Sequence, residues 1–394
     1  MTQAMNPAIV IPAFCRPATL ERLLASLAAA EVPAGTPLVL TIDRPAEERH
    51  RPGHTAVLHL AHGFHWPHGP KEVRQQPEHM GLVGNVFHAG SLAADFGAIV
   101  LLEDDLLVSR RFYGYAQQAL AYYAAEPRLA GISLNTLWFN GFTHQPFIPL
   151  LDDGDVYFLQ LSTPQGQVYT ARQWAHFAEW LAVNGREVTT ADNVHALFAA
   201  FPADDWLAVK AKYLAATQKY YVYPRESLTT NFGEPGTHFA QGTTLFQMPL
   251  QQFRREFRFM PFDDAVAVYD GFYEILPDRL SRMAVNLPVT AYEVDLYATK
   301  AAHQLQADYL LTSRPCRQPV ATYGREMWPL EANVIGGVAG TGLSLARRAD
   351  VDLSVAATRA AQGDNDRYFS RYRTGEAGRR RLFRRMGRLL GRGG

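Results

Sequence analysis

Short apolar runs alternate with an amphipathic pattern over the first hundred residues, and few folds accommodate this alternation. The run Ala8–Ile11 is closed by Pro12, as expected of a buried parallel strand. Leucines then recur at helical spacing and predict a helix from about Pro17 to Ala30. The next apolar run, Leu38–Ile42, predicts a strand that ends at Asp43. Together these segments predict a βαβ unit with a right-handed crossover.

A third strand is predicted from Ala98 to Leu102, directly before the acidic triplet Glu103-Asp104-Asp105. A polar connection rich in His and Pro is expected from about 44 to 77, followed by a helix from about 84 to 96. In open α/β sheets, ligands bind beyond the carboxyl ends of the strands. Asp43 and the triplet both follow such ends, so we expect them to face one crevice.

The rest of the chain mixes helices and short strands without an internal repeat. Ser109 suits the N-cap of a helix that runs to about Ala124. Further helices are expected at about 171–183 and 205–216, and short strands at about 265–269 and 289–292. The pattern as a whole predicts the α/β class, with a mixed sheet flanked by helices.

Composition and charge narrow the functional classes. Hydrophobic residues make up 47% of the 394 residues and charged residues 19%, which is ordinary for a globular enzyme. Lysines and arginines number 38, as do aspartates and glutamates, so no specific nucleic-acid partner is expected. The two cysteines, Cys15 and Cys316, form no metal-ligand pattern and fit a reducing compartment. The sequence shows no signal-peptide pattern and no apolar run of about 18 residues, so we expect a cytoplasmic location.

The acidic triplet is the strongest chemical signal. Carboxylates at the end of a strand suit a hard divalent ion such as Mn²⁺ or Mg²⁺, which prefers oxygen ligands. Such an ion neutralises a departing diphosphate by Lewis-acid action. The alternative is an acidic strand-to-helix turn supported by the helix dipole, without a metal.

Two further motifs carry candidate chemistry. In Asp204-Asp205-Trp206, an aspartate suits the general base that takes a proton from an attacking hydroxyl. The alternative is an N-cap with a first-turn acid. A loop from Tyr223 to Gly233, followed by His238, suits closure over a diphosphate, with His238 as a third metal ligand. The alternative there is an ordinary surface loop.

These pieces, in this order, resemble the GT-A glycosyltransferases, and within them the eukaryotic N-acetylglucosaminyltransferase I family. The start at Ile9–Pro17 is also similar to the bacterial family 2 transferases. The family's nucleotide-binding Asp matches Asp43, and its acidic triplet matches Glu103-Asp104-Asp105. Its Asp-Asp-Trp matches Asp204-Asp205-Trp206, and its Pro-Glu-x-Ser-Arg-Thr loop is similar to Pro224–Gly233. The resemblance spans roughly residues 7 to 240.

The resemblance implies a Rossmann-like nucleotide-diphospho-sugar transferase fold and assigns donor contacts. Pro12 and Arg16 would line the nucleotide pocket, and Asp43 would contact the base. Asp104 would face the ribose or the donor sugar. Glu103 belongs to the same set and is expected at least to brace the turn.

The resemblance also assigns the metal and the base. Asp105 would hold the metal, and Asp205 would be the catalytic base, with Asp204 as the second choice. The loop departs from the family pattern, because Arg225 separates Glu226 from its proline and Leu228 replaces the loop arginine. Diphosphate contacts from this loop are therefore less firmly implied.

Three segments are expected along the chain. Residues 1–245 would form the catalytic domain, and residues 246–375 would form a C-terminal extension packed on it. Residues 376–394 form a basic tail, in which the last sixteen residues carry seven arginines interleaved with Leu, Phe and Met. Such a tail suits an amphipathic helix on an anionic membrane, which would place the protein peripherally on the inner face of the plasma membrane.

The function expected from these observations is an inverting, metal-dependent glycosyltransferase. It would move a hexosyl or N-acetylhexosaminyl group from a nucleotide sugar, with UDP as the expected nucleotide, to a glycan or lipid-linked acceptor. Bacterial surface polysaccharide synthesis is the expected setting. Two alternatives remain, namely a sugar-1-phosphate nucleotidyltransferase and a non-catalytic carbohydrate-binding protein on the same fold. The first usually has a Gly-rich loop after its first strand, whereas Pro12–Pro17 contains no glycine.

Overall fold

The computed structural model describes residues 5–202, 205–234 and 241–370, which form parts of two compact units. Unit 1 comprises Met1–Leu137 and Pro149–Tyr273, and unit 2 comprises Trp138–Ile148 and Glu274–Gly394. Residues 246–273, which the sequence analysis placed in the extension, therefore pack within unit 1. The basic tail at 376–394 lies outside the described residues.

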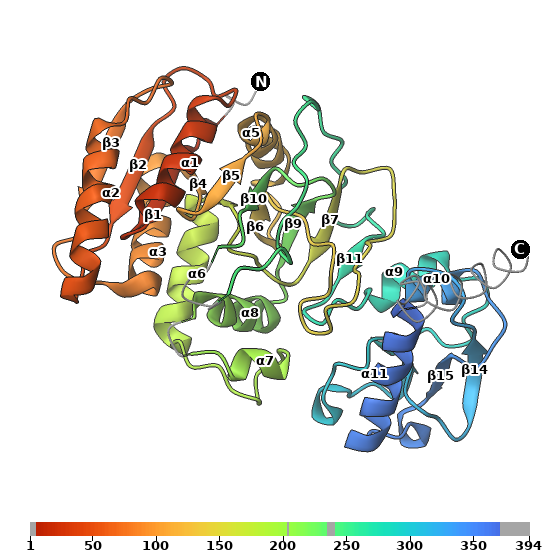
Figure 1. The fold of residues 1–394 in the computed structure, drawn as a ribbon. Coiled ribbons are helices and arrows are strands. Elements are labelled where there is room, and N and C mark those ends of the chain that lie inside the picture. The colour runs from red at the N-terminus through yellow and green to blue at the C-terminus, as the bar shows by residue number, and fades with distance from the viewer. Residues whose placement is uncertain (1–4, 203–204, 235–240, 371–394) are drawn as a thin grey trace, which may run out of the picture. The chain divides into compact units, whose positions relative to one another are not determined.

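Unit 1 is built on one large mixed sheet (Figure 1). Across the sheet, the strands run β11-β7-β9-β6-β8-β4-β1-β2-β3. Their bounds are β1 Ala8–Ala13, β2 Leu38–Ile42, β3 Lys71–Gln75, β4 Ala98–Leu101, β6 Leu129–Ser133, β7 Val156–Leu159, β8 Gln167–Thr170, β9 Tyr220–Pro224 and β11 Val268–Tyr269. The β1–β4 half is parallel, whereas β8 pairs antiparallel with both β4 and β6.

Helices flank this sheet. Their bounds are α1 Pro17–Ala28, α2 Arg51–Gly63, α3 Gly81–Ser91, α4 Ala93–Phe96, α5 Phe112–Tyr123, α6 Ala171–Asn184, α7 Ala196–Ala199 and α8 Trp206–Thr217. Helix α1 packs with α2, whereas α3 and α4 pack with α6. Right-handed crossovers explain this division, because the chain moves outward from β1 to β3 and then returns to β4 on the other face. The expected α/β class, with a mixed sheet flanked by helices, is confirmed.

The sheet has a topological switch point between β1 and β4. The chain runs from β1 to β2 and β3 on one side, and β4 then pairs with β1 on the other side. Crevices at such points open beyond the carboxyl ends of the strands. The turn after β1 and the triplet after β4 therefore share one edge of the sheet.

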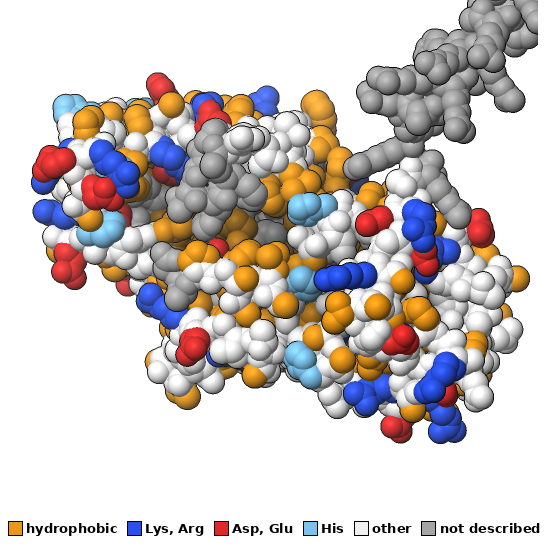
Figure 2. Space-filling view, turned by 60° about the horizontal axis from the view of Figure 1, so that its bottom comes forward, with side chains coloured by type: hydrophobic (Ala, Val, Ile, Leu, Met, Phe, Trp, Pro, Cys, Tyr) orange, Lys and Arg blue, Asp and Glu red, His pale blue; other side chains and the backbone are white. Residues whose placement is uncertain are grey.

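The expected polar connection between residues 44 and 77 is wrong, because it contains helix α2 and strand β3. Helix α2 buries His54, Val57 and Ala61, so a histidine occupies one of the positions that form its apolar face. Strand β3 lies at the sheet edge and is half-exposed, so it needs no apolar pattern. Charged and His side chains gather over this edge of unit 1 in Figure 2. Because this stretch is rich in polar residues, its sequence pattern predicted neither α2 nor β3.

Other boundaries shift by a few residues. The helix expected at 84–96 is divided into α3 and α4, and it ends before Gly97, whose φ is 75°. A strand expected at 289–292 is found instead as β12 at Glu293–Asp295. Among the described residues, no helix is both long and apolar enough to cross a bilayer.

Unit 2 contains a smaller sheet with the order β12-β13-β15-β14. Its remaining elements are β13 Tyr309–Thr312, β14 Pro319–Tyr323, β15 Leu343–Arg347, α9 Pro277–Met283, α10 Leu330–Ile335 and α11 Val355–Ser370. The Arg314 Nε atom donates to Asp295 Oδ2 over 2.6 Å, and both side chains are almost fully buried. Arg314 also donates to the Lys300 carbonyl and to Thr358, so this buried pair is well satisfied.

Lys210 on α8 is an unusual buried residue in unit 1. Its Nζ lies 3.5 Å from the ring centroid of Phe177 and within 5 Å of the centroids of Trp174 (4.6 Å) and Tyr169 (4.7 Å). Among the described residues, no atom accepts a hydrogen bond from this amine. Burial lowers the pKa of Lys210 well below its usual value, although the ring faces favour the charged form.

We expect Lys210→Met to stabilise the protein at pH 7 by about 1 kcal/mol or more, because a buried amine is replaced by an apolar chain of similar length. The unfolded chain binds a proton that the folded chain does not, so the parent gains stability as pH rises toward the unfolded pKa near 10.4. The advantage of the variant should therefore shrink between pH 7 and pH 10. Chemical denaturation at several pH values measures it.

Lys212→Met on the same helix is the matched control. The Lys212 Nζ donates to the Glu187 carbonyl over 2.7 Å and pairs with Asp192, so its loss should not stabilise the protein. An equal gain in both variants would show that burial of Lys210 is not the cause.

Candidate functional site

The acidic triplet and Arg16 form one cluster at the switch point. Arg16 follows β1, and its Nη1 atom donates to Asp105 Oδ2 over 3.0 Å, while Nη2 donates to Asp104 Oδ1. Asp104 is 5% exposed, whereas the Asp105 side chain is 29% exposed. One guanidinium thus spans two carboxylates from the neighbouring strand, and Asp105 faces the more open side.

The surroundings of the cluster favour the protonated, neutral forms of its acids. Burial raises the pKa of Asp104 to about 6, against the lowering effect of Arg16, and the charge of Asp105 raises it further. Burial also raises the pKa of Glu103 well above its usual range, and the charges of Asp105 and Asp104 add to this. Asp104 and Asp105 raise the pKa of Arg16 despite its burial. The site therefore favours cations next to the triplet.

The turn that carries Arg16 is held by close backbone contacts. Its carbonyl accepts hydrogen bonds from the Leu20 amide over 3.2 Å and from the Thr19 hydroxyl over 2.9 Å. Pro17 occupies the first turn of α1, as predicted. Gly53 of α2 approaches so closely that a Cβ there would lie 2.3 Å from the Cys15 carbonyl oxygen. Helix α2, missed by the sequence analysis, therefore supports the turn.

Asp43 follows β2 and is buried, with 3% exposure. Its two carboxylate oxygens accept from the backbone amides of Met80, over 2.8 Å, and Gly81, over 3.0 Å. The His79 Nδ1 atom lies 3.1 Å from Asp43 Oδ2. Asp43 therefore holds the start of α3. It follows β2, which lies on the opposite side of β1 from β4 and the triplet. Its contact with a nucleotide base remains a prediction.

The Asp-Asp-Trp motif reaches the triplet through its tryptophan. A side-chain hydrogen bond from Trp206 lowers the pKa of Glu103 against the raising effect of burial. Asp205 is 6% exposed and its Oδ1 atom accepts from the amides of Leu207, over 2.8 Å, and Ala208, over 3.4 Å. Asp205 is thus the N-cap of α8, as the alternative interpretation expected. Its role as a base remains a prediction.

The predicted loop also meets the triplet segment. Strand β10 (Thr229–Asn231) pairs antiparallel with β5 (Leu106–Val108), and Asn231 lies opposite Leu106. Just beyond, the Arg22 guanidinium of α1 pairs with Glu234 and lies 4.2 Å from the ring centroid of Phe232. The loop end is thereby fixed beside the residue that follows Asp105.

Gly233 is required where this loop turns. Its φ is +61°, and a Cβ there would lie 1.7 Å from the Thr243 carbonyl oxygen. The Thr243 amide also donates to the Gly233 carbonyl over 2.8 Å. This contact joins the two ends of residues 234–242, part of which lies outside the described residues.

The first part of the loop has a structural role. The Arg225 Nη2 atom donates to Asp152 Oδ1 over 2.9 Å, and its Nε donates to the Gly154 carbonyl over 2.9 Å. Glu226 accepts from Gln251 and lies 3.5 Å from Arg254. These contacts give Arg225 and Glu226 partners within unit 1. The structure shows no contact of Arg225 or Glu226 with the triplet.

Two predicted site residues, Asp204 and His238, lie outside the described residues. Pro12 is part of β1, where it pairs with Thr41. Within the described ranges, no group of three or more His, Cys, Asp and Glu side chains has the geometry to hold a metal ion. Asp104 and Asp105 nevertheless supply the hard oxygen ligands that Mn²⁺ and Mg²⁺ prefer, so the donor chemistry fits such an ion.

The sequence analysis missed three contributors to the site. His79 lies beside Asp43, and Phe14 packs against His79 with ring centroids 6.2 Å apart. Glu234 pairs with Arg22 next to the loop. A His shortly before a helix and an Arg six residues after Arg16 are weak signals, because both are common on surfaces. These residues come together through the fold.

Comparisons with known proteins give a distant structural likeness. No protein-family model matches the chain, and no curated protein matches it. Among solved structures, S. aureus TarS 1-349 is similar at 14% identity with a TM-score of 0.30, covering 56% of this chain and 60% of that one. The same fragment in complex with UDP gives 14% identity, a TM-score of 0.32 and the same coverage. A longer TarS chain, at 13% identity and a TM-score of 0.30, also covers 56% of this chain and is itself covered over 36% of its length. The chain thus spans less than two thirds of these TarS chains, and such scores do not transfer a function.

We expect Arg16→Met to destabilise the protein at pH 7 by about 1 to 3 kcal/mol, because Asp104 loses its cation in a buried position. Without the guanidinium, the folded pKa of Asp104 rises above its present value of about 6. The folded state then binds a proton that the unfolded state lacks, so the loss should be smaller at pH 5 than at pH 7. Urea denaturation of the parent and the variant at both pH values measures this difference.

Arg51→Met is the control, since Arg51 pairs with Glu48 on an exposed surface and its loss should change little. A pH-independent loss in Arg16→Met would contradict the role assigned to Asp104.

Proposed function

We propose that the protein is a glycosyltransferase that uses a nucleotide-sugar donor. The observation that carries the proposal is the Arg16–Asp104–Asp105 cluster at the switch point of a mixed α/β sheet. This is the edge at which open α/β sheets bind nucleotides. The buried acids lie next to a more open carboxylate, which suits a cation-assisted phosphate site better than a structural ion pair alone.

The residues of this cluster would bind the donor. Asp105, with Asp104, would hold a Mn²⁺ or Mg²⁺ ion that neutralises the departing diphosphate. In the structure, Arg16 already binds one oxygen of each carboxylate, and its charge lies where an anionic donor would need it. Arg16 would therefore move from Asp105 toward a donor phosphate when a cation takes the carboxylate. Asp43, with His79 and Phe14 beside it, would line the base pocket, with UDP as the expected nucleotide.

On the acceptor side of the reaction, we assign Asp205 as the general base. The acceptor hydroxyl oxygen forms a bond to the anomeric carbon while the bond from that carbon to the diphosphate breaks, and Asp205 takes the hydroxyl proton. This displacement inverts the anomeric centre. Trp206 supports the assignment, because its hydrogen bond to Glu103 ties the start of α8 to the triplet. Asp204 remains the second choice for the base.

The transferred sugar would be a hexose or an N-acetylhexosamine, and the acceptor a glycan or glycolipid of a bacterial surface polysaccharide. We propose a cytoplasmic enzyme whose basic tail, residues 376–394, binds the inner face of the plasma membrane. Seven arginines among the last sixteen residues support this placement through their charge.

We expect Asp105→Ala to lower donor turnover at least about a hundredfold and to weaken Mn²⁺-dependent UDP binding, because the ligand to the cation is lost. Adding EDTA to the parent should have the same effect, and Mn²⁺ should restore activity. Donor hydrolysis and calorimetry measure these two outcomes.

Asp153→Ala is the matched control, because Asp153 is exposed and pairs with Arg258 within unit 1. If Asp105→Ala binds metal and UDP like the parent, the metal assignment is wrong.

A second pair of variants separates the two roles of Asp205. Asn is as good an N-cap as Asp, so Asp205→Asn should keep its stability within about 0.5 kcal/mol while losing transferase activity. Asp205→Ala should lose activity and also about 1 kcal/mol of stability. Transfer assays and thermal unfolding of both variants measure this. An active Asp205→Asn enzyme would leave Asp205 as a cap and shift the base to Asp204.

A further inference from the structure

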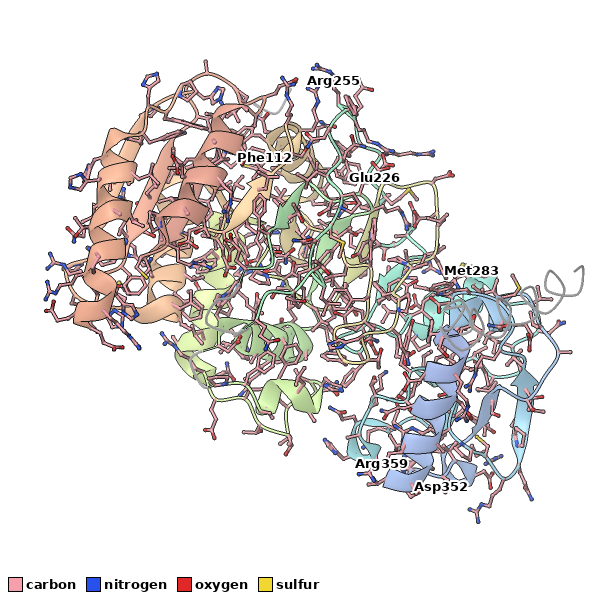
Figure 3. All side chains as sticks on the ribbon, viewed as in Figure 1. Phe112, Glu226, Arg255, Met283, Asp352 and Arg359 are labelled. Carbon is pink, nitrogen blue, oxygen red and sulfur yellow. The ribbon has the colours of Figure 1, made fainter. Side chains whose placement is uncertain are left out.

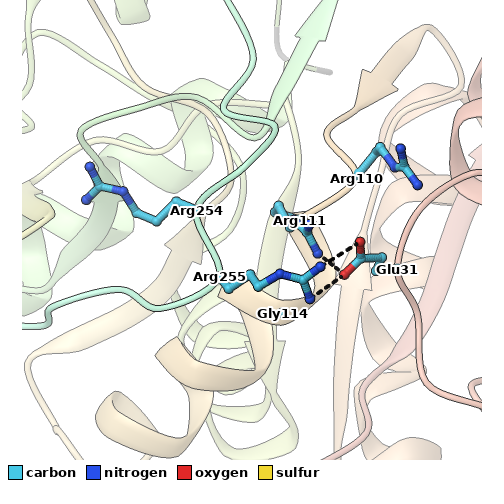
Figure 4. Close-up of a pocket in the computed structure, with 6 residues that line it drawn as sticks. All are labelled: Glu31, Arg110, Arg111, Gly114, Arg254 and Arg255. Atoms are coloured by element: carbon cyan, nitrogen blue, oxygen red, sulfur yellow. Dashed lines mark hydrogen bonds and ion pairs between the residues drawn. The ribbon is translucent and has the colours of Figure 1, made fainter.

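A cavity of about 150 Å³ lies in unit 1, and none of the triplet residues lines it (Figure 4). It is lined by Glu31, Arg110, Arg111, Gly114, Arg254 and Arg255. Three separate segments supply these residues, namely the stretch just after α1, the turn between β5 and α5 with the first turn of α5, and the stretch at 254–255. A water molecule takes about 30 Å³ of liquid volume, so the cavity has room for a tetrahedral oxyanion with bound water.

The cavity carries an excess of positive charge. Of the residues that the structure describes, Glu31 is the only acid that lines it. Glu31 pairs with Arg111 and with Arg255, over 3.1 Å and 3.5 Å to the two Arg255 nitrogens. Among the described residues, the Arg110 guanidinium has no hydrogen-bond or ion-pair partner. In Figure 4, Arg111 and Arg255 lie against Glu31, whereas the Arg110 guanidinium lies apart from this carboxylate. Arg110, Arg111 and Arg255 thus line the cavity with one carboxylate, and two of these three guanidinium groups pair with it.

The fourth arginine is already satisfied elsewhere. Arg254 points away from Glu31 in Figure 4, and it pairs with Asp155 and, over 3.5 Å, with Glu226. Desolvation lowers the pKa of Arg111, and the charge of Arg255 lowers it further. An added anion would relieve this repulsion between Arg111 and Arg255.

The surroundings leave space for a larger ligand. Gly114 lines the cavity without a side chain, and a Cβ there would meet nothing within 4 Å. A second hollow of about 510 Å³ shares Glu31 and is also lined by Val32, Pro33 and His68. Phe253, directly before Arg254, is 86% exposed. Arg255 lies at the outer margin of unit 1, which makes the cavity reachable from solvent (Figure 3).

We infer that this cavity binds a phosphate group of a ligand other than the donor nucleotide. Guanidinium groups bind phosphate through paired, charge-assisted hydrogen bonds, and Arg suits this geometry better than Lys. The phosphate would take Arg110, Arg111 and Arg255 as donors in competition with Glu31. Its source is either a soluble phosphate ester or a phospholipid headgroup, next to which Phe253 offers an apolar contact. The proposal does not rest on the glycosyltransferase assignment.

The test measures binding of inorganic phosphate by calorimetry at constant ionic strength, using the full chain. Arg110→Gln and Arg255→Gln should each weaken binding at least about tenfold, because a charge-assisted hydrogen bond is lost. Arg110 has no structural partner among the described residues, so its variant should fold like the parent. Glu31→Gln should tighten binding, because the internal competitor loses its charge.

Arg258→Gln is the matched control, since Arg258 lies on the same stretch but pairs with Asp153 outside the cavity. Equal weakening of phosphate binding in Arg258→Gln and Arg110→Gln would overturn the proposal. Binding would then depend on the overall positive charge of the protein and not on the cavity. Equal binding by the parent, Arg110→Gln and Glu31→Gln would also overturn it. Asp105→Ala should bind phosphate like the parent, so failure of the donor site and failure of this cavity are distinguishable.

A second arm identifies the source of the phosphate. The parent and Arg110→Gln are sedimented with vesicles of phosphatidylcholine, alone and mixed with phosphatidylglycerol. Weaker sedimentation of Arg110→Gln with the anionic vesicles only would assign a lipid headgroup, and the basic tail, present in both proteins, cancels in this comparison. Equal sedimentation, together with phosphate binding that depends on Arg110, would assign a soluble phosphate ester. If neither arm depends on Arg110, the proposal is overturned.

Discussion

The contact of Arg16 with Asp104 and Asp105 is the interaction on which the candidate site depends. It joins the turn after β1 to the turn after β4 across the switch point of the sheet. Two carboxylates and Glu103 in so small a space would repel one another without a cation. The guanidinium stabilises the cluster in the free protein. In the proposed function, the same guanidinium would also supply positive charge to an anionic donor.

The surrounding packing explains why this contact can form. Gly53 lets α2 approach the Cys15 carbonyl, which leaves the Arg16 turn little room to move. On the other strand, β5 continues from Asp105 and is paired with β10, so the triplet is held on both sides. Trp206 then links Glu103 to α8. The acids are therefore held in place by the surrounding backbone elements.

The sequence predicted the parts of the fold that have a strong apolar period. The buried strands β1, β2 and β4 and helix α1 appear close to their expected places, because one face of each segment is apolar throughout. Helix α2 and strand β3 were missed, since a partly polar helix face and an edge strand leave no clear pattern. In the site, the acids could be predicted as a motif, but the Arg16 contact could not. That contact needs β1 and β4 to be neighbours, and strand order is a property of the whole sheet.

The triplet cluster and the arginine-lined cavity differ in their local balance of charge. The chain has equal numbers of acidic and basic residues, and this balance predicts no long-range attraction for an anion. The local arrangement differs. At the triplet one arginine binds two aspartates, whereas among the described residues four arginines and a single acid, Glu31, line the cavity. The first arrangement has spare negative charge and suits a cation, and the second has spare positive charge and suits an anion. Since screened fields act over roughly 8 Å at physiological salt, each site selects its ligand by its own side chains, independently of the net charge.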